Sequence, residues 1–376
     1  MQQNEIIKTY GTNYKTMTRE LLETAGLSEM IPSKDARIGI KPNLVAPIPA
    51  SYGATTHPEI VAGIIEYLRA SGFSQIVILE SSWVGDKTSE SLEVCGYSEL
   101  LREYDVPFLD MQKDRARKID AGGMELMICQ EALALDFLIN VPVLKGHCQT
   151  KVTCALKNMK GLIPNSEKRH FHAWGLHRPI AHLAAALHQD FILVDQICGD
   201  PDCEDGGNPY VTNCLMAARD PVLCDAYGAS LLGYGADEIP YIIMAEELGV
   251  GSADLHKLCI RQIGHSQEEE KPAKRRRLVA IQDKVEEVDS CSACYANLVP
   301  VLLRLEEEGT LDQLGEKLAI GQGYRGKKGR LGIGNCTRCF EQYIPGCPPE
   351  IEEIDAFLRE IIRKQAGSEG TDRGVQ

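Results

Sequence analysis

The chain of 376 residues carries 40 lysines and arginines against 54 aspartates and glutamates, which gives a formal net charge of −14. Its hydrophobic fraction of 44% is enough to fill a folded core and excludes disorder over most of the length. The acidic balance, with no sustained basic stripe, argues against nucleic acid as a partner.

The expected location follows from two features of the sequence. No stretch approaches the roughly 18 consecutive apolar residues that a spanning helix needs. The start, MQQNEIIKTYGTNYK, lacks the basic end and apolar middle of a signal peptide. We therefore expect a cytoplasmic protein with no membrane partner.

Short apolar strands and an amphipathic helix organise the front half. The helix begins at Pro58, keeps Ile60, Ile64 and Leu68 on one face, and stops at Gly72. Apolar runs typical of strands buried on both faces occur at residues 37–40, 75–80, 106–110, 136–144 and 191–195. This order predicts an α/β fold with a mainly parallel sheet and helices on both faces.

The first of these strands ends in the polar loop KPNLVAP (41–47). Open α/β sheets bind ligands at the carboxyl ends of their strands, so Lys41 lies where a ligand is expected. Asn43 adds an amide donor and acceptor, although a lone loop lysine can equally be solvated. Glu80 and Asp195 end other strands at the same predicted edge.

The segment 141–179 contains four of the nine histidines and five lysines. If TKVTCALKNMKG forms a helix from about Thr150, then Thr150, Thr153 and Lys157 share one face. Such a cationic face with hydroxyl groups suits a carboxylate or phosphate ligand. The alternative is a surface helix with chance histidines.

We expect four side chains to converge on one pocket as the catalytic groups: Lys41, His147, Lys157 and His172. In this hypothesis the two histidines act as the acid/base pair, and crowding lowers the pKa of at least one lysine. The side chains expected to bind the ligand are Asn43, Thr150, Thr153, Asn158 and Lys160.

Two other features are weaker. The loop DQICGDPDCEDGGNP (195–209) could hold a cation or simply be solvated. Asp225 interrupts an otherwise apolar helix and therefore needs a partner. The sequence contains no GxxxxGK[ST] motif, which argues against a P-loop.

The composition changes at residues 261–290, where fourteen of 30 residues are charged. We place the domain boundary there. We expect an α/β domain over 1–285, a smaller module over 286–366 and a disordered tail over 367–376.

Fourteen cysteines are many for a chain in a reducing compartment, where structural disulfides are disfavoured. Nine are scattered from Cys95 to Cys259 and resemble small core residues. The other five cluster near the C-terminus and indicate metal or redox chemistry: Cys291, Cys294, Cys336, Cys339 and Cys347.

Three interpretations of this cluster compete. A 4Fe-4S cluster would use Cys291, Cys294, Cys336 and Cys347, whereas structural zinc would use the two C-x2-C pairs and therefore Cys339. The cysteines could also be unliganded. The Cys347-Pro sequence resembles the Cys-Pro ending of many iron–sulfur ligand sets and favours iron. The predicted helix NLVPVLLRLEEEG would place the site on a small core.

Several motifs together carry a family resemblance. KPNLV, ATTHPE, ILESS, INVPVLKGH, LKNMKGLIP and RDPVLCDA follow one another between about residues 37 and 251 and resemble the family called domain of unknown function 362. The resemblance implies the fold and an associated iron–sulfur module, but no reaction. The loop 199–208 departs from the family's more glycine-rich loop, which puts a role of Asp205 in doubt. A fainter similarity is to nickel-pincer lactate racemases, with His147, Lys157 and His172 in corresponding places.

The leading hypothesis is an iron–sulfur redox protein that exchanges electrons between one 4Fe-4S cluster and a small anionic ligand at the sheet edge. Its partners would be that ligand and an electron donor or acceptor protein. The second hypothesis is a redox-silent isomerase, racemase or lyase for a small carboxylate, with a structural metal. The third is a non-catalytic ligand-binding protein or metallochaperone.

Overall fold

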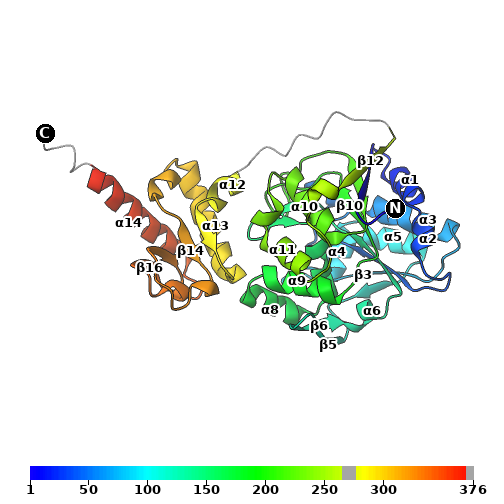
Figure 1. The fold of residues 1–376 in the computed structure, drawn as a ribbon, viewed down its shortest axis with the longest axis horizontal. Coiled ribbons are helices and arrows are strands. Elements are labelled where there is room, and N and C mark those ends of the chain that lie inside the picture. The colour runs from blue at the N-terminus through cyan, green and yellow to red at the C-terminus, as the bar shows by residue number, and fades with distance from the viewer. Residues whose placement is uncertain (265–276, 370–376) are drawn as a thin grey trace. The chain divides into compact units, whose positions relative to one another are not determined.

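The structure is a computed structural model that describes residues 1–264 and 277–369. These residues form two compact units (Figure 1). The first consists of residues 1–169 and 177–264, and the second of residues 170–176 and 277–369. The predicted disordered tail overlaps the last helix, which ends at Glu369, and residues 370–376 lie outside the described residues, as does the segment 265–276.

An eight-stranded sheet organises the first unit within residues 1–264. Its strands, in spatial order, are β12 (Cys259–Ile263), β1 (Glu5–Tyr10), β11 (Cys214–Ala218), β10 (Phe191–Gln196), β7 (Phe137–Val141), β2 (Ile38–Pro42), β3 (Ile76–Glu80) and β4 (Phe108–Asp110). Neighbours run parallel except at β11, which is antiparallel to β1 and β10. The mainly parallel sheet predicted from the apolar runs is therefore confirmed.

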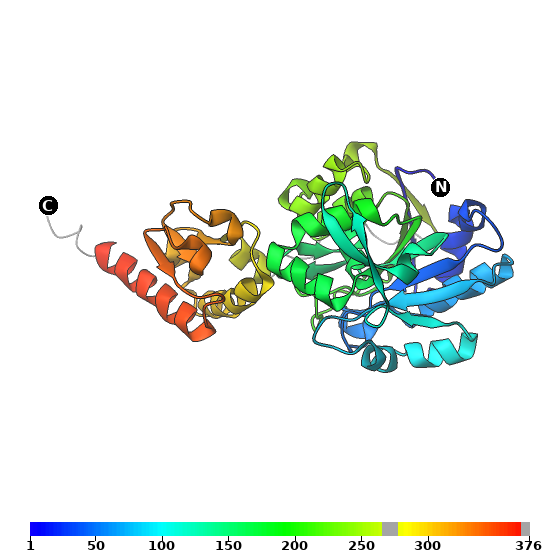
Figure 2. The ribbon, with the colours of Figure 1, turned by 90° about the horizontal axis from the view of Figure 1, so that it is seen from below.

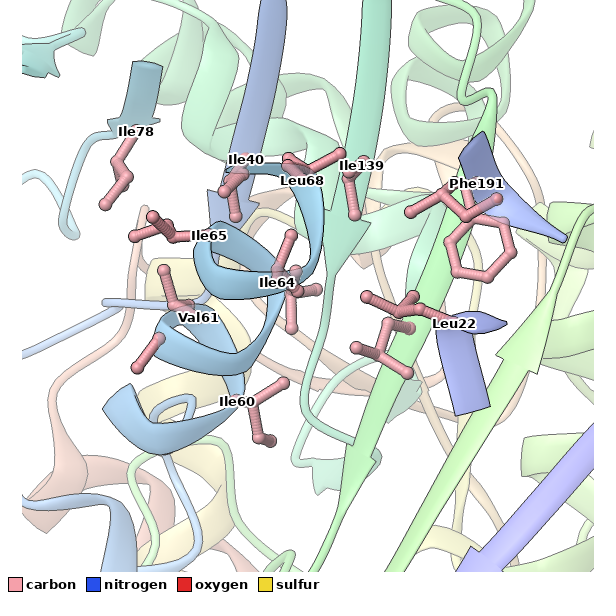
Figure 3. Packing of buried hydrophobic residues seen from close by; sticks show 14 of the residues in the cluster. Leu22, Ile40, Ile60, Val61, Ile64, Ile65, Leu68, Ile78, Ile139 and Phe191 are labelled. Carbon is pink, nitrogen blue, oxygen red and sulfur yellow. The ribbon is translucent and has the colours of Figure 1, made fainter. Parts of the chain in front are cut away.

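One face of this sheet carries the predicted amphipathic helix, α3 (Pro58–Ala70). Pro58 occupies the start of the helix, where its missing N–H costs nothing. Ile60, Ile64 and Leu68 pack against Ile40, Ile78, Ile139 and Phe191 of the strands (Figure 3). The other helices of this layer are α1 (Tyr14–Ala25) and α5 (Tyr97–Tyr104).

Alternate strand residues face the opposite layer. Ile139 points toward α3, whereas the side-chain amide of its neighbour Asn140 donates to the carbonyl of Ala155 in α7. This second layer contains α7 (Ala155–Asn158), α9 (His177–Ala186), α10 (Pro221–Leu231) and α11 (Pro240–Glu247). Helices therefore cover both faces of the sheet, as expected.

The prediction of a helix that begins near Thr150 is wrong. The chain instead forms a hairpin of β8 (Lys145–His147) and β9 (Lys151–Thr153), and α7 begins only at Ala155. β-branched Val152 and Thr153 favour a strand, and Lys151 at φ +65° turns the hairpin. Thr150, Thr153 and Lys157 consequently do not share a helix face.

The remaining elements of the first unit are short. They are α2 (Leu27–Met30), α4 (Thr88–Val94), α6 (Gln130–Leu133) and a hairpin of β5 (Ala116–Asp120) with β6 (Glu125–Cys129). Helix α8 (Asn165–Trp174) belongs to this unit up to Arg169 and to the second unit from His170 on.

The second unit, whose residues 277–369 run from yellow to red in Figure 2, has its own hydrophobic core. A parallel sheet joins β13 (Val285–Glu287), β14 (Leu318–Ile320), β15 (Leu331–Ile333) and β16 (Gln342–Ile344). The apolar sides of α13 (Ser292–Glu307) and α14 (Ile351–Glu369) pack over it, next to α12 (Arg277–Gln282). The amphipathic helix predicted from NLVPVLLRLEEEG is thus confirmed as part of α13.

None of the helices within residues 1–264 and 277–369 combines the length and the apolar character needed to span a bilayer.

Candidate functional site

Polar residues gather at the carboxyl edge of the large sheet. The parallel strands β3, β2, β7 and β10 are consecutive neighbours, so the loops that follow them meet at one edge. Five lysines gather at this edge: Lys41, Lys145 and Lys168 are buried, and Lys157 and Lys160 are half-buried.

Lys41 and Glu80 form a buried ion pair at the ends of β2 and β3. The Nζ of Lys41 lies 2.6 Å from Oε2 of Glu80 and donates to the carbonyl of Pro42 at 2.8 Å. Both side chains are at most 3% exposed. Burial lowers the pKa of Lys41, and the carboxylate of Glu80 opposes this shift. The ammonium group of Lys41 thus already has an anionic partner within the protein.

Gly161 closes this part of the site. A Cβ there would lie 1.7 Å from Oε1 of Glu80 and 2.7 Å from Nζ of Lys41, so glycine alone fits. Lys168 reaches the same loop and donates to Ser81 Oγ at 2.6 Å and to the carbonyls of Ser81 and Ser82. Burial lowers its pKa to about 8.

The second half of the site surrounds the β8–β9 hairpin. Lys145 donates through Nζ to the carbonyls of Ala54 and Glu204, each at 2.6 Å. Burial, followed by the charge of Lys157, lowers the pKa of Lys145 to about 7. The side-chain amine of Lys145 is therefore only partly protonated near neutral pH.

His147 is held in one orientation by the hairpin turn. Its Nδ1 accepts hydrogen bonds from the backbone N–H groups of Gln149 at 3.0 Å and Thr150 at 3.2 Å. Its Nε2 then carries the ring proton and lies 3.6 Å from Oε1 of Glu204. Burial, only partly offset by Glu204, lowers the pKa of His147 far below its ordinary value. The imidazole is consequently neutral.

Lys157 lies near this imidazole, at the end of α7. Burial lowers the pKa of Lys157 to about 8, while Glu204 opposes the shift, and the charge of Lys157 in turn helps to lower the pKa of His147. The pKa of Lys160 is lowered well below its ordinary value by burial and by the charges of Lys157 and Lys168. Lys160 thus links the two halves of the site electrostatically.

The loop 195–209, a candidate cation loop in the sequence, brings an anion instead. Glu204 accepts from the backbone N–H of Cys148 at 2.9 Å and from its thiol at 3.1 Å. Burial disfavours the charge of Glu204, but the charge of Lys157 and the hydrogen bonds from Cys148 hold its pKa below the usual range. A carboxylate of the protein therefore occupies part of the cationic site.

The side chains predicted to bind a ligand have varied surroundings. Asn43 orders its own loop by accepting from the N–H of Val45, and Asn158 donates to Asn140 Oδ1 at 2.7 Å. Thr150 donates to the carbonyl of Val152. Thr153 is paired directly opposite Lys145, and within the described residues its buried hydroxyl has no hydrogen-bond partner.

His172 belongs to the second unit with residues 170–176. Within that unit its Nδ1 lies 2.7 Å from Oγ of Ser292. The convergence of His172 with His147, Lys41 and Lys157 stays a prediction.

Sequence reasoning missed Lys168 and Glu204 as members of the site. Lys168 lies on α8 and reaches a loop more than 80 residues earlier in the chain, and no local pattern signals such a contact. Glu204 lies in an acidic loop whose composition suggested a cation-binding loop. Only its neighbours in the structure show that it is instead an anion within a cationic site.

Two sets of metal-ligand-type side chains lie in the first unit. Within residues 1–264 and 277–369, three such atoms lie within 4.8 Å of one another in the sets His147–Cys148–Glu204 and Cys154–Cys224–Asp225. Asp225, which needed a partner, accepts from the backbone N–H of Leu156. Burial raises its pKa to about 7.

Four C-terminal thiols come together in the second unit. Cys291 caps α13, Cys294 lies in its first turn, Cys336 lies in the 3-10 helix Asn335–Thr337, and Cys347 follows β16. Burial, then the charges of Cys291, Cys347 and Cys336, raise the pKa of Cys294 to about 12. Cys339 is exposed and makes no such contribution.

Glycines bring the loops of this thiol group close. Gly334, at φ +80°, precedes Cys336, and a Cβ there would lie 3.8 Å from the sulfur of Cys294. Gly346, at φ +134°, precedes Cys347, and a Cβ there would lie 2.4 Å from Pro349 Cα. The positive φ of Gly334 disfavours a side chain and the space at Gly346 excludes one, so the chain can fold tightly beside the sulfurs.

The fold and these motifs define an α/β protein with a lysine-rich site at the sheet edge. The chain belongs to the family described as Domain of unknown function (DUF362), whose model matches residues 38–230. This confirms the resemblance stated from the sequence.

Three known proteins are similar to the chain. A thylakoid-associated protein of Synechocystis sp. is 26% identical over 239 residues, which are 62% of this chain and 74% of that protein. The lactate racemase apoprotein of Thermoanaerobacterium thermosaccharolyticum is 16% identical, with a TM-score of 0.38 over 57% of this chain and 54% of the racemase. A Thermotoga maritima protein solved by structural genomics is 11% identical, with a TM-score of 0.37 over 68% of this chain and 62% of that protein.

Proposed function

We propose that the protein is an iron–sulfur redox protein in which Cys291, Cys294, Cys336 and Cys347 hold one 4Fe-4S cluster. The observation that carries this proposal is the approach of these four thiols from two distant segments, a group to which Cys339 does not contribute. A cluster of this type supplies one-electron transfer when bound.

The spacing of the thiols supports iron over zinc. Tetrahedral zinc with Zn–S bonds of about 2.3 Å holds its four thiolates about 3.8 Å apart. Within the described residues, no three of the C-terminal thiols lie within 4.8 Å of one another. A cubane of iron and sulfide separates its four ligands more widely, because each thiolate binds a different iron.

The electrostatics of the thiol group also fit a cationic centre. Burial and the neighbouring thiols raise the pKa of Cys291 and Cys294, so the thiolates resist forming together without a compensating positive charge. Arg325 lies beside Cys336 and supplies part of that charge. The side-chain amide of Gln322 donates to the sulfur of Cys291 at 3.5 Å. Hydrogen bonds to the ligand sulfurs are a usual means of tuning a cluster.

In the first unit, we propose a binding site for a small anion such as a carboxylate. Lysines outnumber carboxylates there, in a chain with a net charge of −14. Lys157 and the unpartnered hydroxyl of Thr153 are the groups that this proposal assigns to the ligand. The proposed partners are this anion and an electron donor or acceptor protein.

The proposed location is the cytoplasm. All fourteen cysteines are free thiols, a state that a reducing compartment maintains.

The proposal is tested on protein purified anaerobically. We expect a brown protein with broad absorption near 400 nm, and with about four iron and four sulfide per chain, the composition of one 4Fe-4S cluster. A colourless protein containing about one zinc per chain would replace the redox function with a structural metal site.

A second function, an isomerase, racemase or lyase for a small carboxylate, is favoured by one specific observation. Neutral His147 and Lys157, with a pKa of about 8, are two acid/base groups of different character near each other. Such an enzyme would exchange the α-proton of a small 2-hydroxycarboxylate with solvent. Proton NMR in D2O would show loss of that signal with the wild type and none with Lys157→Met.

A further inference from the structure

Cys198, His57 and Asp195 form a line of hydrogen-bonding groups in the first unit. The sulfur of Cys198 lies 3.7 Å from Nε2 of His57, and Nδ1 of His57 lies 2.8 Å from Oδ2 of Asp195. Cys198 and Asp195 come from the end of β10, and His57 from the residue before α3. A nucleophile, a base and a group that orients the base thus stand in sequence.

The proton of this line belongs on the imidazole. Asp195 is 1% exposed and also accepts from the backbone N–H groups of His57 at 2.9 Å and Ile197 at 3.0 Å. Burial works against a charged His57, but Asp195 and Cys198 outweigh it and raise the pKa of His57 to about 10. An imidazolium with Nδ1–H on Asp195 directs Nε2–H at the sulfur.

The other groups around His57 do not change this arrangement. The ring of Tyr14 on α1 packs edge-on against the imidazole, with 5.3 Å between centroids, and its hydroxyl donates to Asn213. Glu59, at the start of α3, adds negative charge near Tyr14. The carbonyl of Ala50, 3.3 Å from the sulfur, is an acceptor for the neutral thiol.

We propose that Cys198 is a nucleophilic cysteine, paired with His57, that reacts with small neutral oxidants of the peroxide class. Cys198 is 6% exposed and the side chain of His57 12% exposed, which suits a reactant close to water in size. This site is independent of the proposed iron–sulfur centre and anion pocket.

The reaction is balanced within these groups. The thiolate attacks one peroxide oxygen, an S–O bond forms as the O–O bond breaks, and the departing hydroxide takes the Nε2 proton of His57 and leaves as water. The sulfur loses two electrons to become a sulfenic acid, and the peroxide is reduced.

Cys95 provides a matched internal control. It is 4% exposed, and its thiol donates to carbonyls of the same loop, Ile48 at 3.1 Å and Ala46 at 3.7 Å. Burial raises its pKa. The two cysteines therefore resemble each other in burial and carbonyl contacts, and His57 is the difference.

The full chain is exposed to hydrogen peroxide from pH 6 to 9, and the reaction is stopped with catalase. The protein is then denatured in the presence of dimedone, which labels sulfenic acids, and the label on each cysteine is measured by mass spectrometry. An ordinary thiol of pKa about 8.5 is only about 1% thiolate at pH 6.5. We expect Cys198 to be oxidised at least tenfold faster than Cys95 at that pH.

The variant His57→Gln should slow oxidation of Cys198 about tenfold at pH 6.5, while Cys95 is unchanged. Equal rates for Cys198 and Cys95, or no oxidation of Cys198, would each overturn the proposal. The wild-type rates alone decide the question if His57→Gln does not fold.

Discussion

The ion pair between Lys41 and Glu80 gives a sharp test of what the sheet edge requires. In Lys41→Met the carboxylate of Glu80 keeps its hydrogen bonds from the N–H groups of Ser81 at 2.7 Å and Leu44 at 3.2 Å, but loses its only ammonium contact among the described residues. Removing one partner of a buried pair leaves an uncompensated charge and costs about 3–5 kcal/mol. We expect a loss of that size in the free energy of unfolding.

The matched control is Lys118→Met. Lys118 pairs with Glu125 at the same 2.6 Å, but the two side chains are 62% and 66% exposed. Exposed pairs contribute less than about 1 kcal/mol. Urea unfolding followed by far-ultraviolet circular dichroism at neutral pH compares the two variants with the wild type.

The double variant Lys41→Met with Glu80→Gln separates the pair from the packing of the lysine stem. Neutralising Glu80 should recover part of the lost stability, because the buried charge is gone. A Lys41→Met protein within about 1 kcal/mol of the wild type would refute the reasoning. It would return Lys41 to the role of a direct ligand-binding group, as the sequence predicted.

Three further outcomes concern the same domain. Lys157→Met should weaken oxalate binding, measured by calorimetry, at least about tenfold, which is the size of a lost charge-assisted hydrogen bond. Oxalate binding by the wild type should weaken as pH rises through about 8, where Lys157 loses its proton. An unchanged affinity would contradict the proposed anion site. Glu204→Gln should instead strengthen oxalate binding about tenfold, since a competing carboxylate is removed, and weaker binding would contradict this. The folded pKa of Asp225 is about 7, whereas an aspartate in the unfolded chain has a pKa of about 4. Between these two pH values Asp225 is protonated in the folded state and ionised in the unfolded chain. The wild type should therefore lose stability relative to Asp225→Asn as pH rises through that window, by up to about 4 kcal/mol in thermal or urea unfolding; parallel curves would contradict it.

The sequence predicted the sheet well because buried parallel strands leave a local signal. The continuous apolar runs ending at Glu80 and Asp195 correspond to β3 and β10, and Pro58 marks the start of α3. No comparable sequence signal predicted β1 and β11. β11 pairs with β10, and β1 pairs with β11, so their placement depends on pairings between distant parts of the chain.

Around the candidate site, local reasoning failed where long-range contacts decide. The segment after Lys145 has helical spacing of its polar residues, yet the pairing of Lys145 with Thr153 makes it a hairpin. Glu204 and Lys168 approach the pocket from loops and helices far along the chain. The residue types pointed to an anion site, whereas the internal carboxylates that balance it were visible only in three dimensions.

The central claim, that four particular thiols hold one iron–sulfur cluster, is tested most directly by comparing Cys336→Ser with Cys339→Ser. The two cysteines are three residues apart, but only Cys336 contributes to the raised pKa of Cys294. Iron and labile sulfide per chain are measured after anaerobic purification. We predict wild-type content in Cys339→Ser and a large loss in Cys336→Ser. Loss of metal in Cys339→Ser together with retention in Cys347→Ser would contradict the account and indicate a zinc-ribbon site.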